Sequence, residues 1–293
     1  MAGVPFAGKE WVHMTIGFAI FYGILQGLTE FLPVSSSGHL ALLQSLTGAD
    51  FSDGTYFSFD ILLHLATLLA VCAVYRKELC GLIPACLTAP VALWRGKGRL
   101  SLCTERERTV LLLLLATLPL GLGIFVKDLL EPLYACPRLI GAILLLNGAM
   151  LLLSDCAAHR RRGKPKTAAD AGPLQALAVG FCQLCALLPG LSRSGTTITG
   201  GLLCGFDRAF AVKFSFLLSI PAILGANILN LGELCRDPLP QEAILPCLCG
   251  MLAAALTGIL AMKLLIRISG KGGFWGFGLY CAAVGCFAVS FFR

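Results

Sequence analysis

Two long apolar stretches of this sequence are each broken by a short loop rich in proline, serine and glycine. The first runs from about 14 to 47 and is broken at 33–38, and the second runs from about 174 to 205 and is broken at 189–195. After each break only about ten apolar residues follow, which is too few to cross a hydrocarbon core about 30 Å thick. Each stretch is therefore predicted to form a re-entrant hairpin, in which a helix, a loop and a short helix return to the same side.

The rest of the chain contains apolar segments long enough to cross a bilayer, since about 20 apolar residues suffice for one helical span. Only 13% of the residues are charged and 57% are hydrophobic, whereas about 25% are charged in an ordinary soluble domain. This composition excludes a disordered chain, a collagen-like chain and a water-soluble enzyme. We predict an all-α polytopic membrane protein whose residues 1–293 form a single integral membrane domain. The predicted spans are residues 57–75, 109–127, 138–156, 209–231, 243–266 and 273–292, with a short interfacial helix near 80–94.

The basic residues indicate how these spans are oriented. A net charge of +7 would suit a nucleic-acid partner, but the lysines and arginines stand in short runs between apolar segments, as in cytoplasmic membrane loops. We therefore predict no nucleic-acid partner. If both termini lie outside, seventeen of the 23 lysines and arginines fall inside and five fall outside, while Arg193 lies in the second broken loop. This asymmetry favours a plasma-membrane protein with both termini outside.

An internal repeat divides the chain into two halves, residues 12–156 and 173–293. The loop segments 32–38 and 188–195 share a Leu-Pro start and a Ser-x-Ser-Gly end, and the segment 59–70 resembles 214–225. Each half then holds one re-entrant hairpin and three spans. Because three is an odd number, the second half is predicted to be inverted relative to the first. Inverted repeats with broken helices place a ligand site near the middle of the membrane, where the halves meet.

The two loops are predicted to bind an anion. Ser37 or Ser194 is a reasonable N-cap for the short helix that follows each loop. A helix N-terminus offers unpaired N–H donors and a partial positive charge. Arg193 adds a planar guanidinium that can donate two parallel hydrogen bonds to a phosphate. Placing a cationic side chain at this depth in the membrane costs free energy. Such a residue therefore indicates a functional site.

The first loop adds groups that can move protons. Gln26 and Glu30 are four residues apart and share a helix face, one turn before the loop. Ser36 lies in the loop, and His39 follows it by three residues. A carboxylate, a hydroxyl and an imidazole around one loop can supply a base, a nucleophile and an acid for phosphoryl transfer.

Other polar residues within apolar segments allow more than one interpretation. Asp60 and His64 are four apart on one helix and either line the cavity or form a structural pair. Asn147, Asn227 and Asn230 are expected to join helices. No cluster of acids and histidines has the spacing of a dedicated metal cage, so no metal site is predicted. A Mg²⁺ or Ca²⁺ ion could still arrive with the phosphates of a substrate.

Two long signatures resemble those of the bacterial undecaprenyl-diphosphate phosphatases, the bacitracin-resistance family. The first is the stretch from Gln26 to His39, and the second runs from Pro189 to Ile198. The resemblance implies hydrolysis of a C55 isoprenoid diphosphate to the monophosphate, which recycles the carrier for peptidoglycan synthesis. It also implies a site facing the outer side of the plasma membrane. The family has Glu or Gln, three residues, then Glu in its first signature, so Glu30 carries the acidic role alone here.

Ser36, His39, Arg193 and Thr197 match functional positions of that family. Together with the reasoning from the residues, this gives Ser36 as the preferred nucleophile, with Glu30 and His39 handling protons; a water activated by Glu30 or His39 is the alternative. Arg193 completes the predicted catalytic set. The residues expected to bind the polyprenyl diphosphate are Gln26, Ser35, Ser37, Ser192, Ser194 and Thr197.

Two other functions have similar requirements. A transporter or flippase for a phosphorylated isoprenoid lipid would share the inverted architecture and the anion site, but transport alone needs no nucleophile. A phosphatidic-acid-type phosphatase would need an Arg-Pro dipeptide and a histidine six residues after Arg193, where this chain has Thr199. The sequence leaves the oligomeric state open.

Overall fold

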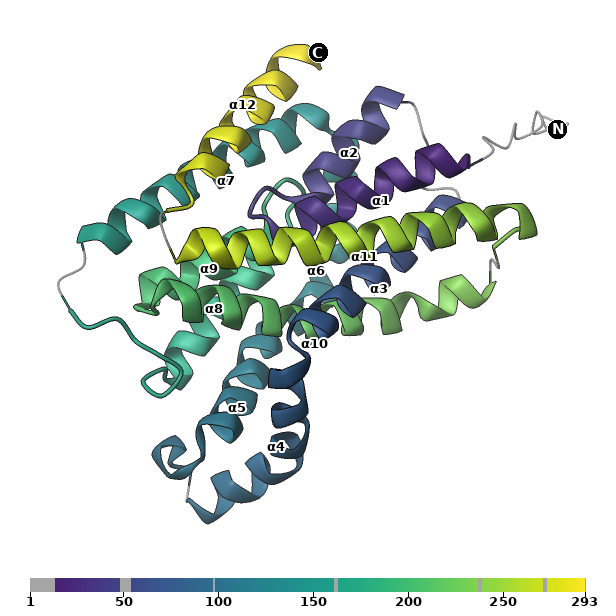
Figure 1. Cartoon of the computed structure of the whole chain (residues 1–293). Coiled ribbons are helices and arrows are strands. Elements are labelled where there is room, and N and C mark those ends of the chain that lie inside the picture. The colour runs from purple at the N-terminus through teal and green to yellow at the C-terminus, as the bar shows by residue number, and fades with distance from the viewer. Residues whose placement is uncertain are drawn as a thin grey trace, which may run out of the picture.

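A computed structural model describes residues 14–47, 54–96, 98–160, 163–236, 239–270 and 273–292. Within these ranges the chain is helical apart from short connections and one isolated β-bridge between Lys166 and Phe206, so the all-α prediction is confirmed (Figure 1). The basic residues Lys9, Lys97, Arg161, Arg162, Lys271 and Arg293, which entered the orientation argument, lie outside the described residues. The α-helices are α1 (Ile16–Phe31), α2 (Ser36–Thr47), α3 (Gly54–Val74), α4 (Arg76–Arg95), α5 (Glu105–Thr117), α6 (Gly123–Leu130), α7 (Pro137–Arg160), α8 (Pro173–Cys185), α9 (Arg193–Cys204), α10 (Arg208–Arg236), α11 (Gln241–Ser269) and α12 (Trp275–Phe291). Three short 3-10 helices are η1 (Leu100–Leu102), η2 (Leu118–Leu122) and η3 (Glu131–Ala135).

Six described stretches are long and apolar enough to cross a membrane, which makes the chain a multi-pass membrane protein. They are Phe57–Val74, Arg76–Arg95, Glu105–Val126, Pro137–Arg160, Arg208–Asn230 and Gln241–Ser269. Five of them coincide with predicted spans. The sixth predicted span, 273–292, corresponds to α12, which belongs to the shorter apolar helices.

Helix α4 is longer than the sequence suggested. The sequence predicts a short interfacial helix near 80–94, and prolines at 84 and 90 would ordinarily interrupt a longer one. Both prolines lie inside α4, which forms a continuous helix of 20 residues. Most of this helix is not buried against the rest of the protein. Figure 1 shows the reason: α4 pairs with α5 in a hairpin that projects from the main bundle. The interfacial placement of α4 stays a prediction.

The first hairpin consists of α1, the loop 32–35 and α2. Helix α1 ends at Phe31, and Leu32 is extended because a residue before proline disfavours the helical conformation. Ser35 then adopts a left-handed conformation with φ of 73°. Its hydroxyl oxygen accepts a hydrogen bond from the backbone N–H of Gly38 at 3.2 Å. Ser35 therefore starts α2 and caps it.

The second hairpin repeats this plan with α8, the loop 186–192 and α9. Gly190 has φ of 93°, and the Ser192 hydroxyl accepts from the N–H of Gly195 at 3.1 Å. The prediction of Ser37 or Ser194 as caps is therefore wrong by two residues. Ser37 and Ser194 lie inside the first turn, where their hydroxyls are within 3.3 Å and 3.1 Å of the capping hydroxyls.

Small residues allow the long helices to approach closely. A Cβ atom on Gly23 of α1 would lie 2.1 Å from the carbonyl oxygen of Gly250 in α11. A Cβ atom on Gly148 of α7 would lie 2.6 Å from the carbonyl oxygen of Gly278 in α12. Such contacts are typical of helix packing in membranes. Helix α1 of the first half packs against α11 of the second half, and α8 of the second half packs against α5 of the first half. The inversion of the halves stays a prediction.

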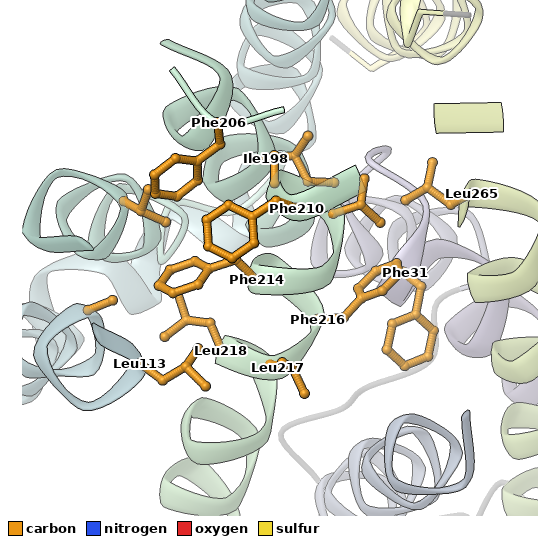
Figure 2. Packing of buried hydrophobic residues seen from close by; sticks show 14 of the residues in the cluster. Phe31, Leu113, Ile198, Phe206, Phe210, Phe214, Phe216, Leu217, Leu218 and Leu265 are labelled. Atoms are coloured by element: carbon orange, nitrogen blue, oxygen red, sulfur yellow. The ribbon is translucent and has the colours of Figure 1, made fainter. Parts of the chain in front are cut away.

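An aromatic core supports the second hairpin (Figure 2). The rings of Phe206 and Phe210 are 4.7 Å apart, and Phe214 is 5.7 Å from each of them. Ile198 of α9 is fully buried in the same cluster, which also reaches Phe31 at the end of α1. Aromatic pairs in such arrangements contribute about 0.5–1.5 kcal/mol beyond the area they bury. The core therefore fixes α9 relative to the end of α1.

Candidate active site

The two loops meet in the interior of the protein. A Cβ atom on Gly38 would lie 2.9 Å from the Cα atom of Gly190, so the first turn of α2 is in direct contact with the second loop. Asn147 of α7 holds them together: its Nδ2 donates to the Pro33 carbonyl at 3.0 Å, and its Oδ1 accepts from the N–H of Ser192 at 3.1 Å. The Ser194 hydroxyl also donates to the Leu32 carbonyl at 3.1 Å. One buried amide thus sets the spacing of both loops.

Asn147 was expected to join helices, and it does more than that by joining two loops to α7. Asn227 behaves differently, because its Nδ2 donates to the Ile223 carbonyl of its own helix at 3.0 Å.

Glu30 is the centre of the site. Its side chain is only 7% exposed. The Ser36 hydroxyl donates to Glu30 Oε2 at 2.8 Å, and Gln26 Nε2 donates to the same oxygen at 3.2 Å. Arg193 Nη2 forms an ion pair with the other oxygen, Oε1. Residues of both hairpins therefore converge on one carboxylate, in the arrangement that suits a base beside a nucleophile.

One terminal nitrogen of the Arg193 guanidinium is not engaged by Glu30. It is the first residue of α9, and its Nη1 atom is buried without a hydrogen-bond partner among the described residues. A buried charged donor without a partner is costly, by more than the roughly 1–3 kcal/mol of a neutral one. Gln26 Oε1 is also buried without a partner. The guanidinium can thus hold Glu30 with one nitrogen and an anion with the other.

His39 has both ring nitrogens occupied outside the Glu30 cluster. Its Nδ1 is 2.7 Å from the Ser35 carbonyl oxygen, and its Nε2 is 2.9 Å from the Tyr280 hydroxyl of α12. The rings of His39 and Tyr280 are stacked at 5.5 Å. A carbonyl only accepts, so Nδ1 carries the proton and Nε2 accepts from Tyr280. The sequence contained no signal for Tyr280, which follows His39 by 241 positions.

Among the described residues, the imidazole nearest to Glu30 belongs to His64 of α3. Its Nε2 is 3.9 Å from Glu30 Oε2. Its Nδ1 is 2.9 Å from the Asp60 carbonyl oxygen and 3.5 Å from Asp60 Oδ2. The sequence left open whether Asp60 and His64 line the cavity or pair with each other; the structure pairs them and places His64 beside Glu30. Their spacing of four residues was the available signal.

Thr197 contacts the backbone of Arg193 and does not contact Glu30. Its hydroxyl donates to the Arg193 carbonyl at 2.7 Å and is 2.6 Å from the hydroxyl of Ser215 in α10. This contact ties α9 to α10 beneath the loop. Ser215 is a further residue that the sequence analysis missed.

The described residues contain no group of three or more histidines, cysteines, aspartates and glutamates that could hold a metal ion. Ser36, Gln26 and Arg193 already donate to the two oxygens of Glu30. An ion that comes with the phosphates of a substrate stays a prediction.

Known proteins similar to this chain carry related names. The family model described as bacitracin resistance protein BacA matches residues 19–287. An undecaprenyl-diphosphatase from Alkaliphilus metalliredigens is 38% identical over 279 residues, which cover 95% of this chain and 99% of the relative. One from Desulfatibacillum aliphaticivorans is 40% identical, with 91% of this chain and 95% of the relative covered. One from Bacteroides fragilis is 37% identical, with 96% and 97% covered.

Proposed function

Because this chain belongs to the BacA family of bacitracin resistance proteins, we propose that it hydrolyses undecaprenyl diphosphate to undecaprenyl phosphate and inorganic phosphate. The reaction recycles the lipid carrier of peptidoglycan synthesis and confers resistance to bacitracin. One observation carries the chemistry: the Ser36 hydroxyl donates to Glu30 Oε2 at 2.8 Å, beside an arginine with a free buried donor.

Ser36 is the nucleophile in this proposal. Its Oγ attacks the terminal phosphorus while its proton passes to Glu30 Oε2. The bond from that phosphorus to the bridging oxygen breaks, and the electron pair leaves with the lipid monophosphate. A water then attacks the phosphoserine, which releases inorganic phosphate and restores the Ser36 hydroxyl. The 2.8 Å hydrogen bond favours this route over direct attack by water, because it already aligns the hydroxyl with its base.

Arg193 stabilises the charge that develops on the transferring phosphoryl group. Its Nη1 is free to donate to a phosphoryl oxygen while Nη2 stays on Glu30. Preorganised donors in a site without water are usually the largest single contribution to such catalysis. The N-termini of α2 and α9 add backbone donors. Gln26, Ser35, Ser37, Ser192, Ser194 and Thr197 orient oxygens of the substrate or the groups that hold them.

His39 contributes through the loop. Its bonds to the Ser35 carbonyl and to Tyr280 anchor the residue before Ser36 to α12. In this proposal His39 positions the nucleophile, and its variants lower kcat through Ser36. Transport without bond cleavage would leave the Ser36–Glu30 contact without a use.

The orientation in the membrane is part of the proposal. The excess of lysines and arginines in one set of loops supports both termini outside, in the plasma membrane of a bacterium. The site then opens toward the outer face, and the isoprenoid tail stays in the bilayer while the diphosphate enters between the two loops.

The test is phosphate release from undecaprenyl diphosphate by the purified protein in detergent. We expect Glu30→Gln, Ser36→Ala and Arg193→Ala each to lower kcat about 10²-fold or more. Ser45→Ala is the matched control, because Ser45 lies in the same helix as Ser36 and donates only to the Ala41 carbonyl. Thermal melting checks that each variant folds.

Two outcomes would change this conclusion. A small loss for Ser36→Ala would transfer the attack to a water activated by Glu30. A folded wild-type protein that binds the lipid but releases no phosphate, with or without Mg²⁺ or Ca²⁺, would contradict hydrolysis and favour a lipid transporter.

A further inference from the structure

The reaction proposed above leaves a proton on a buried group. At neutral pH the substrate trianion and water become two dianions, the lipid monophosphate and hydrogen phosphate, and one proton. That proton starts on the Ser36 hydroxyl and passes to Glu30. The Glu30 side chain is only 7% exposed, and Ser36, Gln26 and Arg193 surround its oxygens. Glu30 must lose the proton before the next turnover, so the site needs a route from Glu30 to water.

Two side chains of α3, those of His64 and Asp60, lie next to Glu30 and are more exposed than it is. His64 is 34% exposed and Asp60 is 39% exposed, so exposure rises along the series from Glu30 to Asp60. The distances are 3.9 Å from Glu30 Oε2 to His64 Nε2 and 3.5 Å from His64 Nδ1 to Asp60 Oδ2. The mechanism above uses neither residue.

We propose that His64 takes the proton from Glu30 and hands it to water, with Asp60 orienting the ring. This inference rests on the proposed phosphatase function. In the step, the O–H bond at Glu30 Oε2 breaks, an N–H bond forms at His64 Nε2, and the carboxylate is restored. The imidazolium then loses a proton to water and returns to the neutral form. His64 acts through Glu30 and does not touch the substrate, so it is a positioning and relay residue.

The groups that face His64 suit a proton in transit. Glu30 of α1 and Asp60 of α3 attract a proton on the ring, while Arg193 of α9 opposes it. Tyr134 of η3 interacts electrostatically with Asp60. The opposing charges let the ring bind a proton and release it again. Imidazole is also the side chain whose ordinary pKa, about 6.5, is nearest to neutral pH.

The same chain contains a natural comparison for this pair. Asp155 and His159 of α7 have the same spacing, and His159 Nδ1 is 2.9 Å from the Asp155 carbonyl oxygen, as His64 Nδ1 is from Asp60. Asp155 forms its ion pair with Arg208 at 3.0 Å. The local arrangement alone is therefore a helix feature. What distinguishes His64 is the carboxylate of Glu30 beside its second nitrogen.

The test measures kcat and kcat/KM against pH for the wild type, His64→Gln, Asp60→Asn and the control His159→Gln. Glutamine keeps a donor near Glu30 but cannot carry a proton. We expect His64→Gln to lower kcat about 10-fold to 100-fold with little change in KM. The relay works with a neutral ring, so wild-type activity falls as acid protonates His64. Without the ring, we expect the acid limb to move to lower pH, because a carboxylate takes up its proton at lower pH than an imidazole does.

Rescue separates a relay from a structural role. Free imidazole in the assay should restore several-fold activity to His64→Ala and should leave Ser36→Ala inactive. Asp60→Asn should show a smaller loss than His64→Gln, and His159→Gln should keep the wild-type profile.

The relay is wrong if His64→Gln keeps the wild-type kcat, or if it loses activity equally at every pH without rescue by imidazole. Either result requires an active wild-type protein. An inactive wild-type protein would instead contradict the proposed function, so the two failures are distinguishable.

Discussion

The two hairpins share one backbone plan but differ in chemistry. Each has a helix, a proline-containing loop, a serine that caps the second helix and a left-handed residue, Ser35 or Gly190. The first hairpin carries Glu30 and Ser36, and the second carries Arg193. In the second, Leu187 follows Gln183 by four positions, as Glu30 follows Gln26 in the first. The repeat therefore supplies a common scaffold, while the acid Glu30 and the cation Arg193 each occur in one hairpin only and meet across it.

The largest expected effect comes from removing the fork of Arg193. Lysine cannot hold Glu30 and a phosphoryl oxygen with two separate nitrogens, so Arg193→Lys should retain the charge but lose most of the activity. We expect kcat for phosphate release to fall about 10²-fold. Lys213→Arg, a change outside the loops, is the control. Activity within a few-fold of the wild type in Arg193→Lys would show that a point charge is enough.

The contact between the hairpins depends on Asn147. Asn147→Ala removes its bonds to the Pro33 carbonyl and to the Ser192 N–H, which leaves the Ser192 N–H unpaired and the Pro33 carbonyl with only the Cys281 thiol at 3.8 Å. At about 1–3 kcal/mol for each of the two lost bonds, we expect the free energy of unfolding in detergent to fall by about 2–6 kcal/mol. The matched control is Asn227→Ala, whose amide bonds only its own helix. Equal losses in both variants would contradict a special role for Asn147.

A substitution at Gly38 tests how closely the first hairpin approaches the loop of the second. A Cβ atom there would lie 2.9 Å from the Cα atom of Gly190, and backbone cannot move aside as a side chain does. We expect Gly38→Ala to destabilise the protein by about 1–3 kcal/mol. Gly17→Ala is the control because nothing lies within 4 Å of its added Cβ atom. The experiment is a pair of denaturation curves, and similar curves for both variants would mean that the loops are farther apart.

The smallest effect is expected at the glutamine of the second hairpin. Both amide atoms of Gln183 are buried without partners among the described residues, whereas Gln26 donates to Glu30. Gln183→Leu should therefore leave stability unchanged or slightly raised, because an apolar group can replace an unpaired polar one without loss. Gln26→Leu should lower activity several-fold. Phosphate release and melting temperature are the readouts, and a loss of activity in Gln183→Leu would reveal a use for this amide.

Much of the site was predictable because it depends on local spacing. Gln26 and Glu30 share a helix face at a separation of four residues, and Ser36 follows the break in the same hairpin. Arg193 stood out as a cation among glycines and serines inside an apolar stretch. The caps were misplaced by two residues, because a loop conformation such as that of Ser35, with φ of 73°, has no signal in the residue type.

The sequence by itself determined the apolar helices, the two breaks and the residues that carry charge at those breaks, since hydropathy and helical period act over one or two turns. Only the tertiary structure decided that His64 lies beside Glu30, that Tyr280 engages His39 and that Asn147 joins the loops. These contacts depend on how each helix is rotated against its neighbour. That rotation is set by close packing at positions such as Gly23 and Gly250, which are far apart in the chain and meet only when the bundle forms.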